Sequence, residues 1–121
     1  MTKKSETGKL GEDLACRYLV QNGYKVIERN HRQKWGEIDI IAKEKDGTLL
    51  LIEVKTATGS HPAIAGEDQM TTSKIHKFKK IAQSYATNYF KDRDDSKGFR
   101  LDLLTVNINL EDCHIKHYKN I

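Results

Sequence analysis

The run Leu49-Leu50-Leu51-Ile52 is the feature that most restricts how this chain can fold. Successive side chains of a β-strand point to opposite faces of the sheet, so a strand without a polar position must be covered on both faces. Helices provide that cover in α/β proteins. The run therefore predicts a central strand over residues 48–55 with a helix packed on each face.

Helical and extended patterns alternate along the rest of the chain. Apolar residues recur at helical spacing over residues 7–22, where Thr7 is placed to cap the helix and Gly23 to end it. Ser73 is placed to cap a second helix, in which apolar residues again fall at spacings of three and four. Extended patterns predict four further strands, over residues 24–29, 37–43, 99–108 and 113–118.

This order of elements predicts an α/β fold with a mixed five-stranded sheet flanked by helices. A chain of 121 residues, of which 37% are hydrophobic, can build one such core, so residues 1–121 are expected to form a single domain. The connection over residues 56–72 is longer than the usual ~4–6 residues, and such loops are commonly functional or mobile.

Composition argues against several classes of protein. The chain has no apolar stretch near the ~18 residues of a membrane span, and residues 1–6 lack the apolar run of a signal peptide, so a cytoplasmic location is expected. Cys16 and Cys113 lie far apart without a C-x-x-C partner, which favours two small buried side chains over a disulfide framework or a zinc site. The net charge of +4 would suit an anionic partner but is also common in ordinary proteins.

Glu53 and Lys55 are charges at the end of the apolar central strand, and both point to the same face of the sheet. Burying either ion without a partner costs several kcal/mol. A half-exposed ion pair at a strand end is the simplest interpretation of these two residues alone. Asp39 changes that balance, because it lies inside the apolar segment 36–41 of the preceding strand.

Two registers are open for the hairpin that joins these strands. A two-residue loop, 46–47, pairs residue 39 with residue 54 and places Asp39 and Glu53 on opposite faces of the sheet. A three-residue loop, 45–47, with Gly47 in the left-handed conformation, pairs Asp39 with Glu53, as would a bulge. We predict the second register, because two carboxylates on one face become favourable with a cation between them.

Magnesium suits two such carboxylates. Mg²⁺ prefers oxygen ligands, keeps several waters and is typically held by one or two carboxylates and a substrate phosphate. The absence of a cysteine or histidine cluster argues against zinc, and Mn²⁺ is the alternative to Mg²⁺. A metal at Asp39 and Glu53, with Lys55 beside it, fits phosphodiester hydrolysis without a covalent intermediate.

The spacing of these acids resembles the nuclease superfamily named for its P-D and D/E-x-K motif, which has a restriction-endonuclease-like fold. Ile38-Asp39 is followed after thirteen residues by Glu53-Val54-Lys55, with Ile38 where the superfamily name has proline. More narrowly, the chain resembles the YraN-like proteins, small bacterial domains similar in fold to Holliday-junction resolvases. The segments that carry this resemblance are Gly8-Lys9-Leu10-Gly11-Glu12, Arg29-Asn30-His31-Arg32, Gly36-Glu37-Ile38-Asp39-Ile40-Ile41 and Glu53-Val54-Lys55-Thr56.

The resemblance implies a role for each acidic residue. It makes Asp39 and Glu53 the metal ligands, Lys55 the catalytic lysine and Glu12 the acidic site residue of the first helix, with a contact to the metal through water. Spacing alone leaves Glu12 equally well explained as an acid favoured by the helix dipole.

Basic residues near the motif are candidate nucleic-acid contacts. Trp35 could stack on a base or sugar, although packing beside the glycine turn is its commoner role. Ala57 stands where a basic residue often follows E-V-K-T, which weakens the case for a phosphate contact there. The candidate phosphate contacts are Arg29, Arg32, Lys34 and Lys74.

Other polar residues are left out of the predicted site. Asp102, on a strand beside Arg100, is interpreted as half of a structural ion pair. His114 and His117 lie three apart on a predicted strand and so point to opposite faces, which is poor geometry for a shared metal. The remaining histidines without a motif are His31, His61 and His76.

The preferred hypothesis is a magnesium-dependent endonuclease that hydrolyses phosphodiester bonds in DNA, branched or otherwise structured, in recombination or repair. The resemblance to junction resolvases implies a twofold homodimer. The alternative is a catalytically inactive module of the same fold that binds nucleic acid or a protein. Two facing carboxylates argue against that module, because they repel the phosphates it must hold.

Overall fold

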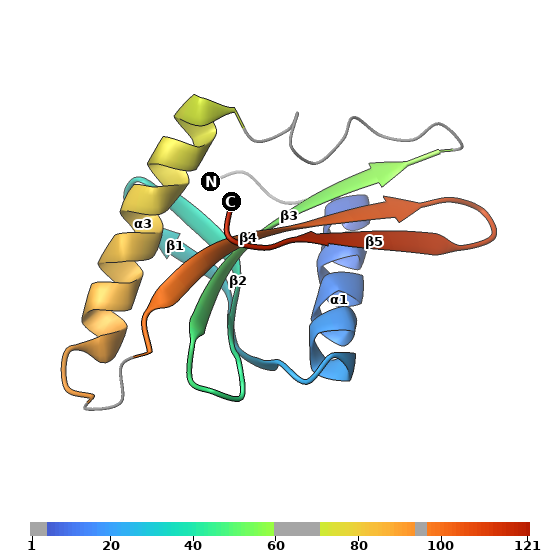
Figure 1. The fold of residues 1–121 in the computed structure, drawn as a ribbon. Helices are drawn as coiled ribbons and strands as arrows, with labels where there is room; N and C mark the ends of the chain where they lie inside the picture. The colour runs from blue at the N-terminus through green and yellow to red at the C-terminus, as the bar shows by residue number, and fades with distance from the viewer. Residues whose placement is uncertain (1–4, 60–70, 94–96) are drawn as a thin grey trace.

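The computed structural model describes residues 5–59, 71–93 and 97–121 and confirms the predicted α/β fold, a mixed five-stranded sheet flanked by helices (Figure 1). Part of the predicted long connection, residues 60–70, lies outside the described residues. No described helix is long and apolar enough to cross a membrane. In chain order the elements are α1 (Glu6–Gln21), β1 (Lys25–Gln33), β2 (Gly36–Lys43), β3 (Leu49–Thr58), α3 (Thr72–Phe90), β4 (Phe99–Ile108) and β5 (Cys113–Tyr118).

The strands lie side by side in chain order, from β1 to β5. Only the β3–β4 pair is parallel among these neighbours, and the other three pairs are antiparallel. A parallel pair needs a crossover, and α3 lies on the segment between β3 and β4. The sheet therefore combines a three-stranded meander, β1 to β3, with the hairpin of β4 and β5.

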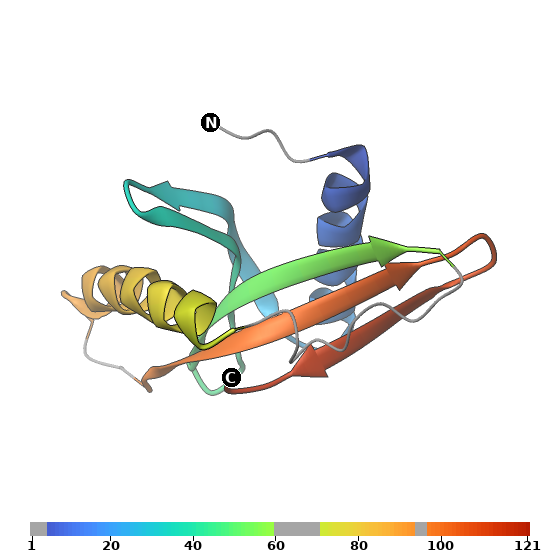
Figure 2. The same ribbon diagram turned by 90° about the horizontal axis from the view of Figure 1, so that it is seen from above.

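The two helices cover opposite faces of the sheet, as the central apolar run predicted (Figure 2). Leu49 and Leu51 belong to the core cluster under α3, whereas Leu50 and Ile52 belong to the cluster under α1. All four side chains have no exposed surface. Burying a leucine or isoleucine fully contributes about 1.5–3 kcal/mol, so this strand is the main point where the two halves of the core meet.

Both predicted helix caps are wrong by two residues. Ser5, not Thr7, accepts a hydrogen bond from the Gly8 amide at 3.0 Å. Thr71, not Ser73, accepts from the Lys74 amide at 3.2 Å. A capping residue needs an extended backbone so that its hydroxyl meets the amide three residues ahead, and among nearby hydroxyl residues the sequence does not reveal which one adopts it.

Several predicted extents and burials also differ. β1 continues to Gln33 because its polar second half pairs with β2, and polar residues of an edge strand carry no apolar signal. Leu10, one of the apolar residues that give segment 7–22 its helical spacing, is half exposed on α1 instead of buried. Cys16 and Cys113 are free thiols and only partly buried, and burial raises the pKa of both.

A polar network anchors β4 to its neighbours. Asp102 is fully buried and accepts hydrogen bonds from Arg100 Nε at 3.0 Å, His117 Nε2 at 2.7 Å and the Asn120 amide at 3.0 Å. The predicted Asp102–Arg100 ion pair is thereby confirmed, and Tyr18 of α1 extends the network to His117 at 3.2 Å. Burial alone would raise the pKa of Asp102, but the hydrogen bonds from His117, Arg100 and Asn120 hold it below its ordinary value.

Replacing Asp102 by Asn should lower the free energy of unfolding at pH 7 by about 3 kcal/mol, because a buried ion pair loses one partner. Because the pKa of Asp102 is lower in the folded state, this stabilisation is present above the ordinary carboxyl pKa, 3.8, and is lost as the pH falls through the folded-state value. The difference in free energy of unfolding between wild type and variant should therefore shrink as the pH falls below 3.8. Urea unfolding at a series of pH values measures it.

Asp112→Asn is the matched control for this experiment. Asp112 also pairs with a histidine, His114, at 3.2 Å, but both side chains are more than half exposed. Exposed ion pairs contribute little to stability, so this variant should behave as the wild type. Equal losses in the two variants would contradict the structural role of Asp102.

Candidate active site

The hairpin between β2 and β3 has the register predicted from the three-residue loop. The Glu44 amide donates to the Thr48 carbonyl at 2.9 Å, and Gly47 adopts a φ of +100°. The paired residues run from Lys43 and Leu49 to Ile40 and Ile52. The next positions along this register are Asp39 and Glu53, so these two residues lie opposite each other where the β2–β3 pairing ends.

The two strands separate at that point. β2 keeps its pairing with β1 as far as Gly36, and β3 keeps its pairing with β4 as far as Thr58, but no β2–β3 pair follows Ile40 and Ile52 among the described residues. Figures 1 and 2 both show the β1–β2 hairpin turning away from β3. The backbone groups on the facing edges of this fork therefore need partners other than each other.

Asp39 supplies one of those partners. Its Oδ2 accepts a hydrogen bond from the Val54 amide at 2.8 Å, and the side chain is only 5% exposed. The alternation of β2 also breaks here, since Ile38 packs under α3 whereas Ile40 packs under α1. Asp39 thus occupies the turning point of β2 and joins it to β3 through a side chain.

Glu53 and Lys55 lie on the β3 side of the fork. Lys55 Nζ is 3.2 Å from Glu53 Oε1, and both side chains are partly exposed, at 30% and 23%. This is the ion pair that the simplest sequence interpretation predicted. Its position beside Asp39 gives the pair a carboxylate neighbour on the opposite strand.

Glu12 reaches the same place from α1 and is 2% exposed. Gly11 allows the approach, because a Cβ there would clash with Thr56 Oγ1 on β3. Arg29 Nη2 lies 3.4 Å from Glu12 Oε1 and 2.8 Å from Asp13 Oδ1. The arginine offsets part of the cost of burying the Glu12 carboxylate.

All four predicted catalytic residues line one cavity of about 330 Å³; they are Glu12, Asp39, Glu53 and Lys55. The residues that line it come from the start of α1, from β2 and from β3. They are Ser5, Thr7, Gly8, Glu12, Glu37, Asp39, Glu53, Val54, Lys55 and Thr56.

The donor set of this cavity suits a hard divalent cation. Asp39 and Glu53 offer carboxylate oxygens from two strands, which is the ligand type that Mg²⁺ and Mn²⁺ take. No group of three His, Cys, Asp or Glu side chains is arranged to hold a metal within residues 5–59, 71–93 and 97–121. In proteins, Mg²⁺ is commonly held by one or two carboxylates together with water and substrate oxygens.

The predicted nucleic-acid contacts separate into two groups. Arg29 and Arg32 are engaged by acids, Arg29 as described and Arg32 with Glu37 at 3.5 Å. Lys34 lies over the Trp35 ring, 5.1 Å from its centroid. Lys74 lines a second cavity beside Glu53 and Lys55.

Two residues of that second cavity differ from sequence expectations. Trp35 is 76% exposed, so its interpretation as a packing residue is wrong; the turn holds the indole away from the core. Lys77 also lines the cavity, one helical turn after Lys74. The sequence does indicate that Lys77 accompanies Lys74, because residues three apart lie on the same face of a helix.

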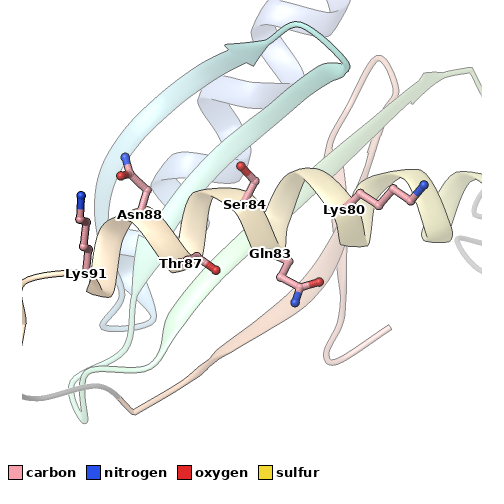
Figure 3. Close-up of a pocket in the computed structure, with 6 residues that line it drawn as sticks. All are labelled: Lys80, Gln83, Ser84, Thr87, Asn88 and Lys91. Carbon is pink, nitrogen blue, oxygen red and sulfur yellow. The ribbon is translucent and has the colours of Figure 1, made fainter.

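Another hollow, of about 580 Å³, lies on the outer face of α3. Figure 3 shows all six lining side chains projecting from that one helix, and none is an acid or a histidine. Lys80 and Lys91 are the ionisable side chains of this lining, and without a carboxylate or imidazole among the lining residues they form no acid–base pair.

Comparison with known proteins identifies close relatives in sequence. The model of a family described as "Uncharacterised protein family UPF0102" matches residues 11–106. A UPF0102 protein from Syntrophus aciditrophicus (strain SB) is 36% identical over 125 residues, covering 99% of this chain and 91% of the relative.

Two solved structures resemble the chain more distantly. A repair endonuclease from Pyrococcus abyssi aligns over 92% of this chain with a TM-score of 0.41 and 16% identity, and the EndoMS-dsDNA2 complex over 83% with 0.38 and 16%. The chain spans 41% and 36% of the length of these two proteins. Similarity at this level leaves the function to be inferred from the site.

Replacing Asp39 by Ala should lower the free energy of unfolding by about 1–2 kcal/mol, because the Val54 amide loses its acceptor at the fork. Asp39→Asn should retain most of the stability, since its amide oxygen can accept the same hydrogen bond. Urea unfolding in the presence of a metal chelator measures both variants. Equal losses would show that the charge of Asp39, and not its hydrogen bond, holds the fork.

Proposed function

The chain belongs to the uncharacterised protein family UPF0102, and we propose that it is a metal-dependent endonuclease that hydrolyses phosphodiester bonds in DNA. One observation carries this proposal. Asp39, Glu53, Lys55 and the buried Glu12, which come from three separate elements, line a single cavity at the fork of β2 and β3. A fold gains no stability by gathering three carboxylates, and such arrangements are typical of functional sites.

Asp39 and Glu53 would hold the Mg²⁺ or Mn²⁺ ion in this site. A hydrogen bond from the Val54 amide holds the Asp39 carboxylate in place, and the ion pair with Lys55 holds the Glu53 carboxylate. When bound, such an ion supplies Lewis acidity toward the scissile phosphate. Ligands held in place before the ion arrives lose little conformational entropy on binding it.

Lys55 would act on the phosphate directly. Its ammonium group is held 3.2 Å from Glu53 and lines the same cavity. A fixed positive charge there stabilises the negative charge that gathers on the phosphate oxygens in the transition state. It also offsets the repulsion between an incoming phosphate and the carboxylates.

Glu12 would orient or deprotonate the attacking water. It is the most deeply buried of the acids in the cavity, and the missing side chain of Gly11 lets α1 lie close to Thr56 of β3. A carboxylate fixed in this way can hold a water in one orientation toward the phosphorus. Arg29 keeps this carboxylate in place from the outer side.

Branched or structured DNA, in recombination or repair, is the substrate we propose. A resolvase of this kind must place two active sites across a symmetric junction, so a twofold dimer is part of the proposal. Catalytic residues here lie on strands and on a helix, which hold them more rigidly than loops would.

Cleavage assays test the proposal. Wild type should cut four-way, flapped or linear DNA with Mg²⁺ and not with a chelator. Glu53→Gln and Lys55→Ala should each lower the rate by about 100-fold or more, because the first removes a ligand of the metal ion and the second removes a positive charge that stabilises the transition state. Glu111→Gln, at an exposed position of the β4–β5 turn, is the control that should cut normally. Binding without cleavage of any substrate by the wild type would support the inactive binding module instead.

Metal binding can be measured separately from cleavage. Adding Mg²⁺ or Mn²⁺ should raise the melting temperature of the wild type, because a ligand that binds only the folded state stabilises it. Asp39→Asn and Glu53→Gln should abolish the shift, and Glu111→Gln should keep it. An undiminished shift in both ligand variants would place the ion outside this cavity.

A further inference from the structure

A second cavity, of about 250 Å³, lies on the α3 side of the fork and shares part of its lining with the acidic cavity. Glu37, Glu53 and Lys55 line both. The second cavity adds Trp35 from the β1–β2 turn and two lysines, Lys74 and Lys77, from α3. A ligand held in the acidic cavity therefore has beside it a second cavity lined by an aromatic ring and lysines.

Trp35 is the unusual member of this lining. A tryptophan that is 76% exposed on the tip of a hairpin adds nothing to the core, although packing is what large aromatics usually provide. Gly36, with a φ of +152°, has no Cβ that would meet Ile81 at 2.6 Å, so the turn can lie against α3 while the indole stays outside. Lys34 lies 5.1 Å from the ring centroid and adds a positive charge next to it.

The chemistry of this cavity suits a nucleotide. An exposed indole stacks on the flat face of a base, and lysines beside it attract the phosphates on either side. Lys74 and Lys77 project from α3 into the same lining. A nucleotide combines a flat base, which can stack on Trp35, with phosphates, which the lysines attract. An aliphatic ligand would offer neither group.

We propose that Trp35 stacks on an unpaired nucleobase of the DNA strand whose phosphate enters the acidic cavity. This inference rests on the proposed function and names its substrate class. A base inside a duplex is covered on both faces by its neighbours, so only an unpaired or extruded base can lie against the indole. The site thus selects DNA with unpaired nucleotides next to the cut, as at flaps, junctions and single-stranded ends.

Trp35 is the single tryptophan of the chain, which makes its fluorescence a direct probe. A thymine oligonucleotide, added to the wild-type protein in a chelator, should quench this fluorescence as it binds. A blunt duplex of the same length should bind more weakly and quench less. Fluorescence anisotropy of the labelled DNA gives both affinities.

Variants separate stacking from general attraction. Trp35→Ala should weaken binding of the single strand roughly 5- to 150-fold, the loss expected for one stacked base, and leave duplex binding nearly unchanged. Trp35→Phe should recover most of the affinity. Leu110→Ala, which removes another exposed apolar side chain, at the β4–β5 turn, is the control and should bind as the wild type.

The outcomes distinguish this inference from the function on which it rests. Cleavage that depends on Mg²⁺, with no quenching and no effect of Trp35→Ala, overturns the stacking site alone. Quenching and selective loss in Trp35→Ala, without cleavage by the wild type, support the stacking site and overturn the nuclease. No binding of any DNA overturns both, and equal loss for single strand and duplex shows that Trp35 does not select unpaired bases.

Discussion

The hydrogen bond from the Val54 amide to Asp39, at 2.8 Å, is the contact on which the candidate site depends. β2 and β3 stop pairing after Ile40 and Ile52, which opens a gap in the middle of the sheet. A gap of this kind exposes backbone groups that a continuous sheet would satisfy. The Asp39 side chain satisfies one of them, and in doing so it lies beside Glu53 and Lys55.

The acids of the fork each have a compensating contact. Asp39 has the Val54 amide, Glu53 has Lys55 and Glu12 has Arg29, at 2.8, 3.2 and 3.4 Å. Buried carboxylates without such contacts would cost several kcal/mol each or would bind protons. These contacts are local to the fork, whereas the core consists of two clusters, one under each helix. The same logic holds for Asp102, where buried donors surround a carboxylate that serves the fold and not the site.

The fork also makes the site accessible from both faces of the sheet. The cavity beside α1 is acidic, and the cavity beside α3 is aromatic and basic. Glu53 and Lys55 belong to both because they lie on β3, which borders the gap between them. The two cavities thus adjoin at the break in β2–β3 pairing, where their linings share Glu37, Glu53 and Lys55.

The sequence by itself determined the features that depend on local chemistry. The apolar run of β3 specified a strand covered on two faces, and the loop ending at Gly47 specified the register that leads Asp39 toward Glu53, because alternation and turn geometry act over a few residues. Only the tertiary structure decided what depends on contacts between distant segments. The burial of Glu12 needs Gly11 against Thr56, the exposure of Trp35 needs the turn against α3, and the choice of Ser5 and Thr71 as caps needs the paths by which the chain enters its helices. Spacing along the chain carries no information on these contacts, since each is set by how helices and strands pack on one another.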